Sequence, residues 1–147
     1  MIMTGSTVFS IANLIVMPMW ALMIFAPKWK GTQFLIDYKL IPLLLAILYA
    51  IYTVININAG VATDFSSLAS VMKLFTVENA VLAGWIHYLA FDLFIGTWEV
   101  GDAIKRGINR WFVLPCLLCT FMLGPVGLVL YFILRAVMTK KVAHENF

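Results

Sequence analysis

The sequence predicts an all-α membrane protein with four transmembrane helices, and three observations support this fold class. Of the 147 residues, 63% are hydrophobic and only 12% are charged, whereas soluble domains carry about 25% charged residues. The hydrophobic residues gather in four long segments, each reaching the roughly 20 residues that cross a bilayer as a helix. Short polar links separate these segments. We therefore expect one four-helix transmembrane domain over residues 1–147.

The first two spans have clear ends. The first covers residues 6–26 and is followed by Lys28 and Trp29, which suit the headgroup region. A polar link over residues 31–39 contains no predicted helix and leads to the second span, residues 40–58.

One face of the second span is polar. Tyr49, Tyr52, Thr53 and Asn56 follow the spacing i, i+3, i+4, i+7, which places their side chains on the same side of a helix. We expect Tyr49, Tyr52 and Asn56 to contact a substrate. The alternative is that this face only holds neighbouring helices together by hydrogen bonds.

A short amphipathic helix is predicted over residues 65–75. Its apolar residues alternate with serines and a lysine at helical spacing. Because this segment is too short to span a bilayer, we expect it to lie in the membrane interface.

The third span, residues 77–106, carries most of the ionisable groups of the hydrophobic segments. On a helical wheel, the acidic and basic side chains from His87 to Arg106 share an arc of roughly 140°. His87 and Asp92 lie in its hydrophobic part, where ionisable groups are rare and usually functional. An imidazole and a carboxylate together supply a general base and a general acid. We therefore predict His87 and Asp92 as catalytic residues, with partners inside the bundle as the alternative explanation.

Further candidates for substrate contact lie on the same helix. Aromatic side chains with a few polar groups suit a long apolar ligand. Glu99 and Asp102 share a face with Lys105 and Arg106, so an interfacial ion network is the alternative for these two carboxylates. The predicted substrate-binding residues of this helix are Trp85, Phe91, Trp98, Glu99 and Asp102.

The fourth span, residues 112–137, contains Gly124, Pro125 and Gly127. Two glycines around a proline permit a kink and a close approach of backbones inside a membrane. Cys116 and Cys119 have no acidic or histidine companion in this span, so we expect packed side chains and no metal site. No cofactor motif is present, and we expect no cofactor.

Four stretches in the same order resemble the neoxanthin synthase family, the abscisic-acid-deficient-four-like membrane proteins. They are Ala26-Pro27-Lys28, Met72-Lys73-Leu74-Phe75, Trp85-Ile86-His87 with Asp92-Leu93-Phe94, and Pro125-Val126-Gly127. The resemblance implies an isomerisation that opens the epoxide of a carotenoid and forms an allene. The link between the second and third spans is shorter than in the plant members, which favours a bacterial-type member.

The sequence therefore predicts a carotenoid- or isoprenoid-binding isomerase. The alternatives are a pigment-binding or assembly subunit of a larger membrane complex and, with less support, a proton-coupled carrier. The expected partners are the lipid bilayer, the isoprenoid ligand, and a membrane complex or homo-oligomer, with no nucleic acid. No Lys or Arg precedes Lys28, so we expect no signal or transit peptide and either a bacterial protein or an already processed organellar form. The expected location is a bacterial inner or photosynthetic membrane, which the protein crosses several times.

Overall fold

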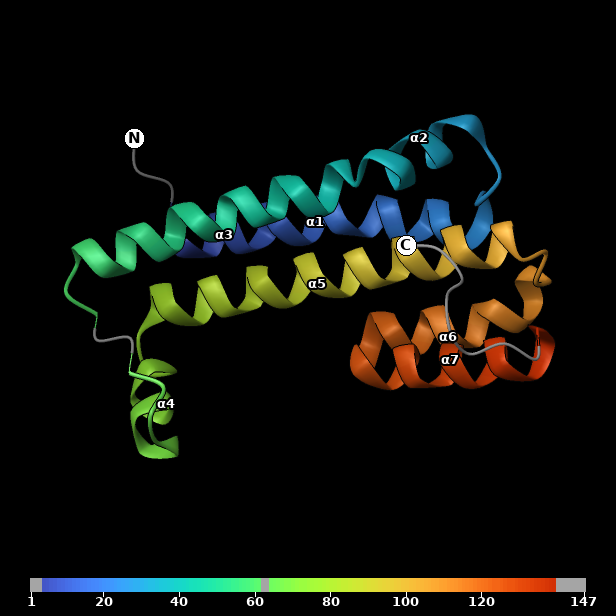
Figure 1. Cartoon of the computed structure of the whole chain (residues 1–147). Coiled ribbons are helices and arrows are strands. Elements are labelled where there is room, and N and C mark those ends of the chain that lie inside the picture. The colour runs from blue at the N-terminus through green and yellow to red at the C-terminus, as the bar shows by residue number, and fades with distance from the viewer. Residues whose placement is uncertain (1–3, 62–63, 140–147) are drawn as a thin grey trace. The chain divides into compact units, whose positions relative to one another are not determined.

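The computed structural model describes residues 4–61 and 64–139, and these residues contain seven α-helices and no strand. The predicted all-α class is therefore confirmed for this part of the chain. The helices are α1 (Gly5–Phe25), α2 (Lys30–Tyr38), α3 (Leu40–Asn58), α4 (Leu68–Leu74), α5 (Glu78–Lys105), α6 (Arg110–Leu123) and α7 (Pro125–Thr139) (Figure 1). Three of them, α1, α3 and α5, are long and apolar enough to cross a membrane.

The helices form two compact units. The first unit combines residues up to Met17 with Ile41–Phe91, and the second combines Pro18–Leu40 with the chain from Asp92 onward. Helices α1 and α5 each contribute one part to each unit.

In the first unit, α5 packs against α1 and α3. Ile86 on α5 and Leu45 on α3 are completely buried, and the rings of Phe9 and Trp85 lie 5.4 Å apart between α1 and α5. Only 17% of the apolar stretch of α3 is buried. Most of this helix therefore presents its aliphatic side chains outward. Such a surface is suited to contact with lipid.

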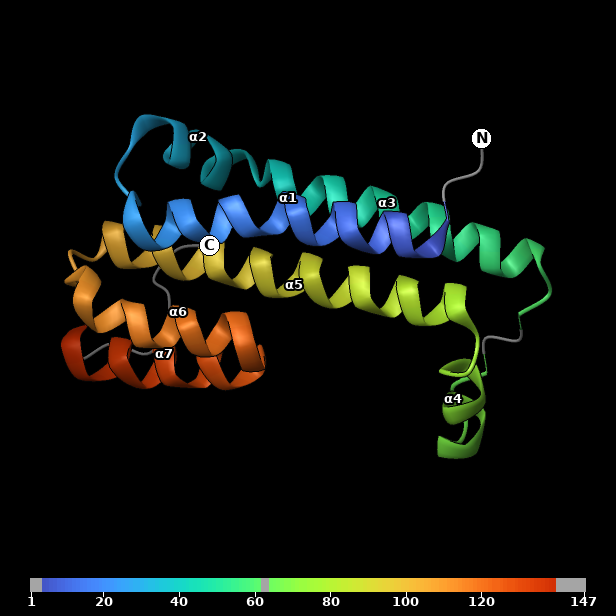
Figure 2. The ribbon, with the colours of Figure 1, turned by 180° about the vertical axis from the view of Figure 1, so that it is seen from behind.

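The short helix α4 begins at a side-chain cap. The Ser67 hydroxyl accepts a 3.1 Å hydrogen bond from the backbone N–H of Ser70, which satisfies one of the free donors of the first turn. The helix covers Leu68–Leu74, inside the predicted segment 65–75. It lies at the start of α5 and runs crosswise to it (Figures 1 and 2).

The second unit contains a helix that the sequence analysis missed. The sequence predicts a polar link over residues 31–39, but the structure has a helix, α2, at Lys30–Tyr38. Its buried residues Thr32 and Ile36 are four positions apart, so one narrow face packs inward, while the aromatic rings of Phe34 and Tyr38 are exposed. The helix ends at Lys39, which adopts a left-handed conformation with φ of 52°.

The fourth span predicted over residues 112–137, with a kink near Gly124, is not confirmed, because two separate helices occupy this segment. Instead α6 ends at Leu123 and the chain reverses, so that α6 and α7 lie side by side in both views (Figures 1 and 2). Gly124 permits the reversal because it adopts a φ of 51°, and Pro125 opens α7 where its missing N–H costs nothing. At 14 and 15 residues, each helix is shorter than a bilayer requires.

Two glycines allow close packing in this unit. A Cβ atom on Gly96 would lie 2.6 Å from the buried ring of Trp20, so α1 and α5 approach closely there. A Cβ atom on Gly127 would collide with the backbone of Thr120. The contact between α6 and α7 therefore depends on the absence of a side chain at Gly127.

Candidate functional site

A pocket of about 400 Å³ lies in the first unit, between α3, α4 and the start of α5. We call it the His87 pocket. Its wall is mainly apolar and includes Ile57, Phe65 and Phe75. The polar side chains that line it are Tyr49, Thr53, Asn56 and His87. An apolar cavity with a few polar groups is the usual form of a small-molecule site.

His87 is exposed at the wall of this pocket. Its ring stacks on Phe91 at a centroid distance of 4.6 Å and meets the edge of Tyr49 at 5.2 Å. Aromatic neighbours at these distances hold the imidazole in a defined orientation. The imidazole therefore lies beside a phenol in an apolar environment.

Asn56 presents an unsatisfied acceptor. Its side-chain N–H donates a 3.2 Å hydrogen bond to the backbone carbonyl of Asn79. Its oxygen Oδ1 is buried and accepts no hydrogen bond from the residues that the structure describes. A buried acceptor without a donor costs about 1–3 kcal/mol. Asn56 lines the His87 pocket, and a ligand hydroxyl that reached Oδ1 from the pocket would remove this cost.

The structure brings together three of the predicted site residues of this unit, Tyr49, Asn56 and His87. Phe91 joins them through its stacking on His87. Tyr52 on α3 is half-buried and is not among the residues that line the pocket. Trp85 is also outside the lining and packs against Phe9 and Tyr88.

Asp92 belongs to the second unit, unlike His87. It is buried and lies at the turn between α6 and α7, where a Cβ atom on Gly124 would stand 2.7 Å from its Oδ1. Any side chain at position 124 would therefore press on this carboxylate.

Glu99 and Thr120 form the first of two buried polar contacts between α5 and the α6–α7 hairpin. The Thr120 hydroxyl is 2.9 Å and 3.1 Å from the two carboxylate oxygens of Glu99. Both side chains are completely buried. Burial of a carboxylate is costly unless it is hydrogen-bonded, so this contact fixes the distance between α5 and α6.

Asp102 forms the second contact. Arg106 Nε donates to both of its oxygens at 2.9 Å, and the Tyr131 hydroxyl donates at 2.8 Å. Arg135 Nε lies 3.6 Å from the same carboxylate. The rings of Trp98 and Tyr131 meet edge to face with their centroids 5.4 Å apart. The expected interaction of Asp102 with Arg106 is present, and the structure adds two partners from α7.

Sequence reasoning missed Thr120, Tyr131 and Arg135. Tyr131 and Arg135 are one helical turn apart in an apolar helix, and this spacing was the available signal. Thr120 is the only hydroxyl-bearing residue of α6. A single polar residue in an apolar helix usually forms a hydrogen bond with another buried polar group.

These features define an all-α protein with membrane-compatible helices, an apolar pocket and a helical hairpin held by buried polar contacts. The chain belongs to the ABA DEFICIENT 4-like family, whose family model matches residues 7–131. The family assignment made from the sequence is therefore confirmed.

One curated relative is similar over most of the chain. It is named Protein ABA DEFICIENT 4, chloroplastic, from Arabidopsis thaliana, and is 29% identical over 145 residues. The alignment covers 93% of this chain and 64% of the relative, so the chain spans less than two thirds of that protein's length. No solved structure matches the chain.

Proposed function

We propose that this protein is a multi-pass membrane protein that binds one end of a carotenoid or related isoprenoid and isomerises it. The observation that carries the proposal is the Tyr49–His87 pair at the wall of an apolar pocket. Membership of the ABA DEFICIENT 4-like family supports a carotenoid as the ligand, because the resemblance to neoxanthin synthases implies an epoxide-opening isomerisation. A pocket of about 400 Å³ suits an end ring, and the polyene chain extends from it along the lipid-facing surface.

The reaction requires two proton movements and no oxidant. A base removes a proton from a carbon beside the epoxide, and the electrons of that C–H bond form a new double bond. The C–O bond of the epoxide breaks, and its oxygen receives a proton. The substrate is thereby isomerised with no net change of atoms or electrons.

His87 and Tyr49 suit these two tasks. A neutral imidazole is a general base near pH 7, and a phenol is a proton donor. In our proposal His87 takes the proton from carbon and Tyr49 protonates the oxygen. In the same proposal the proton returns from the imidazolium to the phenolate, and the centroids of the two rings lie 5.2 Å apart. Both residues return to their starting state.

The Asn56 oxygen has a positioning role in this scheme. A hydroxyl group on the end ring would donate to the unsatisfied Oδ1 and fix the ring in the pocket. Asp92 remains a candidate proton partner from the sequence analysis, and we test it by substitution. Glu99 and Asp102 accept hydrogen bonds from α6 and α7, so we propose that they hold the hairpin rather than the substrate.

The test uses purified protein in lipid nanodiscs with an epoxy-carotenoid that carries hydroxylated end rings. Products are separated by chromatography for the wild type, His87→Ala, Tyr49→Phe and Asp92→Asn. General acid–base groups contribute about 10²–10⁴-fold, so we expect a loss of this size for His87→Ala. The matched control is Val81→Ala, which removes a similarly exposed side chain of α5 outside the pocket.

Two outcomes would overturn the proposal. Wild-type turnover by His87→Ala would remove the imidazole from the reaction. Binding of the pigment without conversion by the wild type would favour the alternative, a non-catalytic pigment-binding or assembly subunit.

A further inference from the structure

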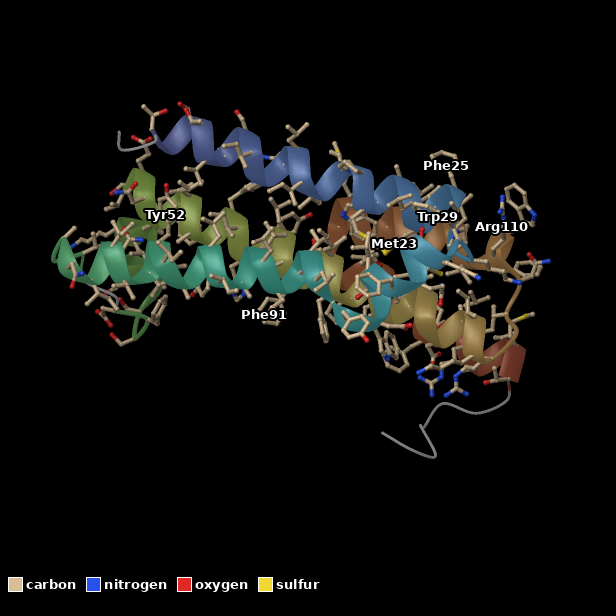
Figure 3. The ribbon with its side chains drawn as sticks, turned by 90° about the horizontal axis from the view of Figure 1, so that it is seen from above. Met23, Phe25, Trp29, Tyr52, Phe91 and Arg110 are labelled. Atoms are coloured by element: carbon tan, nitrogen blue, oxygen red, sulfur yellow. The ribbon has the colours of Figure 1, made fainter. Side chains whose placement is uncertain are left out.

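A second cavity, separate from the His87 pocket, lies in the second unit and has a volume of about 720 Å³. We call it the Trp29 cavity. It is formed by the end of α1 with the following turn, the end of α5 and the start of α6. Figure 3 labels Met23, Phe25, Trp29 and Arg110, which lie at this end of the unit. None of the residues that line the cavity takes part in the proposed isomerisation.

The inner part of the Trp29 cavity is apolar and closely packed. Met23, Val100 and Leu117 line it and are each at most 3% exposed. These three side chains form an apolar floor, which offers no hydrogen-bonding group to a sugar or a nucleotide base. It is suited to an acyl or isoprenoid chain.

The outer part carries two cations and two indole rings. Lys28, Trp29, Arg110 and Trp111 line the cavity and are all exposed. The Arg110 guanidinium carbon lies 4.8 Å from the centroid of the Trp111 ring, a contact that orients the cation. Among the described residues that line the cavity there is no Asp or Glu. The rim is therefore complementary to an anion.

The start of α6 adds to this positive potential. The Asn109 side chain caps the helix by accepting a 3.1 Å hydrogen bond from the backbone N–H of Trp111. The positive end of the α6 dipole therefore lies in the cavity wall beside Arg110. Together with the side-chain cations, this arrangement favours a phosphate group.

We propose that the Trp29 cavity binds an anionic phospholipid of the surrounding bilayer. Lys28 and Arg110 hold its phosphate, the indoles of Trp29 and Trp111 lie at headgroup level, and one acyl chain lies on the apolar floor. Charge complementarity and the combination of a cationic rim with an apolar floor select an anionic amphiphile over a zwitterionic one. This proposal does not depend on the activity proposed for the His87 pocket.

The test is native mass spectrometry of the full chain released from detergent and titrated with phosphatidylglycerol or phosphatidylcholine. Each cation near a lipid surface contributes enough for several-fold affinity, so we expect the wild type to prefer phosphatidylglycerol by about tenfold. The double variant Lys28→Gln/Arg110→Gln should lose this preference. The matched control, Lys30→Gln/Lys73→Gln, removes the same charge from exposed residues outside the cavity and should keep it.

Four outcomes would overturn the proposal. Three are equal binding of both lipids by the wild type, an unchanged preference in the cavity variant, and an equal loss in the control variant, and the fourth comes from a competition with phosphate. Inorganic phosphate is added as a competitor to separate a lipid site from a phosphate site. Displacement of the lipid by millimolar phosphate alone would show that the apolar floor adds nothing.

Discussion

The phenol of Tyr131 on α7 donates a 2.8 Å hydrogen bond to Asp102 on α5, and both side chains are buried. Asp102 also accepts from Arg106, one turn further along α5. The carboxylate thus receives donors from its own helix and from the hairpin. This contact explains how a charged group is accommodated inside an apolar unit, because its lone pairs are satisfied from two sides.

Tyr131→Phe should destabilise the protein. The substitution keeps the ring and removes the hydroxyl, which leaves Asp102 Oδ2 with one donor fewer. Loss of a partner from a buried charged acceptor costs about 1–3 kcal/mol, and the free energy of unfolding in a denaturing detergent titration should fall by this amount. Tyr38→Phe is the matched control, because Tyr38 is exposed in the same unit. Equal stability of the two variants would contradict a role for the Tyr131 hydroxyl.

Gly127→Ala tests the hairpin. A Cβ atom at this position would collide with the backbone of Thr120, and a backbone cannot move aside as the end of a side chain can. We expect a loss of at least about 2 kcal/mol, measured by the same titration. Gly101→Ala is the control, since its Cβ would meet only Ile36 at an ordinary 3.8 Å. If the two alanine variants are equally stable, α6 and α7 do not pack as closely as described.

The link before α4 should respond to acid. Hydrogen bonds from Ser66 and then from the Ser70 hydroxyl favour the ionised form of Asp64 and lower the pKa of its carboxyl to about 2. Because the folded pKa is depressed, the stabilisation is complete above the ordinary value of 3.8 and is lost as the pH falls through about 2. A carbon-detected NMR titration of the Asp64 carboxyl measures this value directly.

Ser70→Ala should raise the Asp64 pKa toward its ordinary value, because the substitution removes one of the donors. Thr76→Ala is the control, since that hydroxyl donates to the Lys73 carbonyl near the other end of α4. An unchanged pKa in Ser70→Ala would show that this hydrogen bond does not form in solution.

The sequence predicted the helical class well because composition and segment length decide it. The reversal at Gly124 and Pro125 was not predictable in the same way, since this pair permits either a kink or a turn. Whether the chain kinks or reverses depends on what the residues after Pro125 pack against, and in the structure Gly127 packs closely against Thr120. The helix α2 was missed because only Thr32 and Ile36 of its nine residues are buried, too few for a clear periodic pattern.

The candidate site was predictable in part. Helical spacing placed Tyr49 and Asn56 on one face, and both line the His87 pocket. Spacing alone could not exclude Tyr52 from the lining, because part of the pocket wall comes from Phe65 and Phe75, which lie outside α3. Two of the partners of Asp102, Tyr131 and Arg135, were missed for a related reason. They come from α7, whose position depends on the reversal.

Asn56→Leu should separate stability from ligand binding. The substitution removes the unsatisfied Oδ1, which favours the empty protein, and also removes the hydrogen bond to the Asn79 carbonyl. These effects oppose each other, so the free energy of unfolding should stay within about 1 kcal/mol of the wild type. Affinity for a carotenoid with hydroxylated end rings should fall about three- to tenfold, because the ligand hydroxyl loses its acceptor.

Two comparisons make this prediction specific. The affinity for a hydrocarbon carotene, measured by pigment titration in nanodiscs, should not fall in Asn56→Leu, since such a ligand has no hydroxyl to donate. Asn58→Leu makes the same chemical change two residues further along α3, at an exposed position outside the pocket lining, and should alter neither affinity. An equal loss for both pigments in Asn56→Leu would mean that residue 56 shapes the pocket and does not recognise a hydroxyl group.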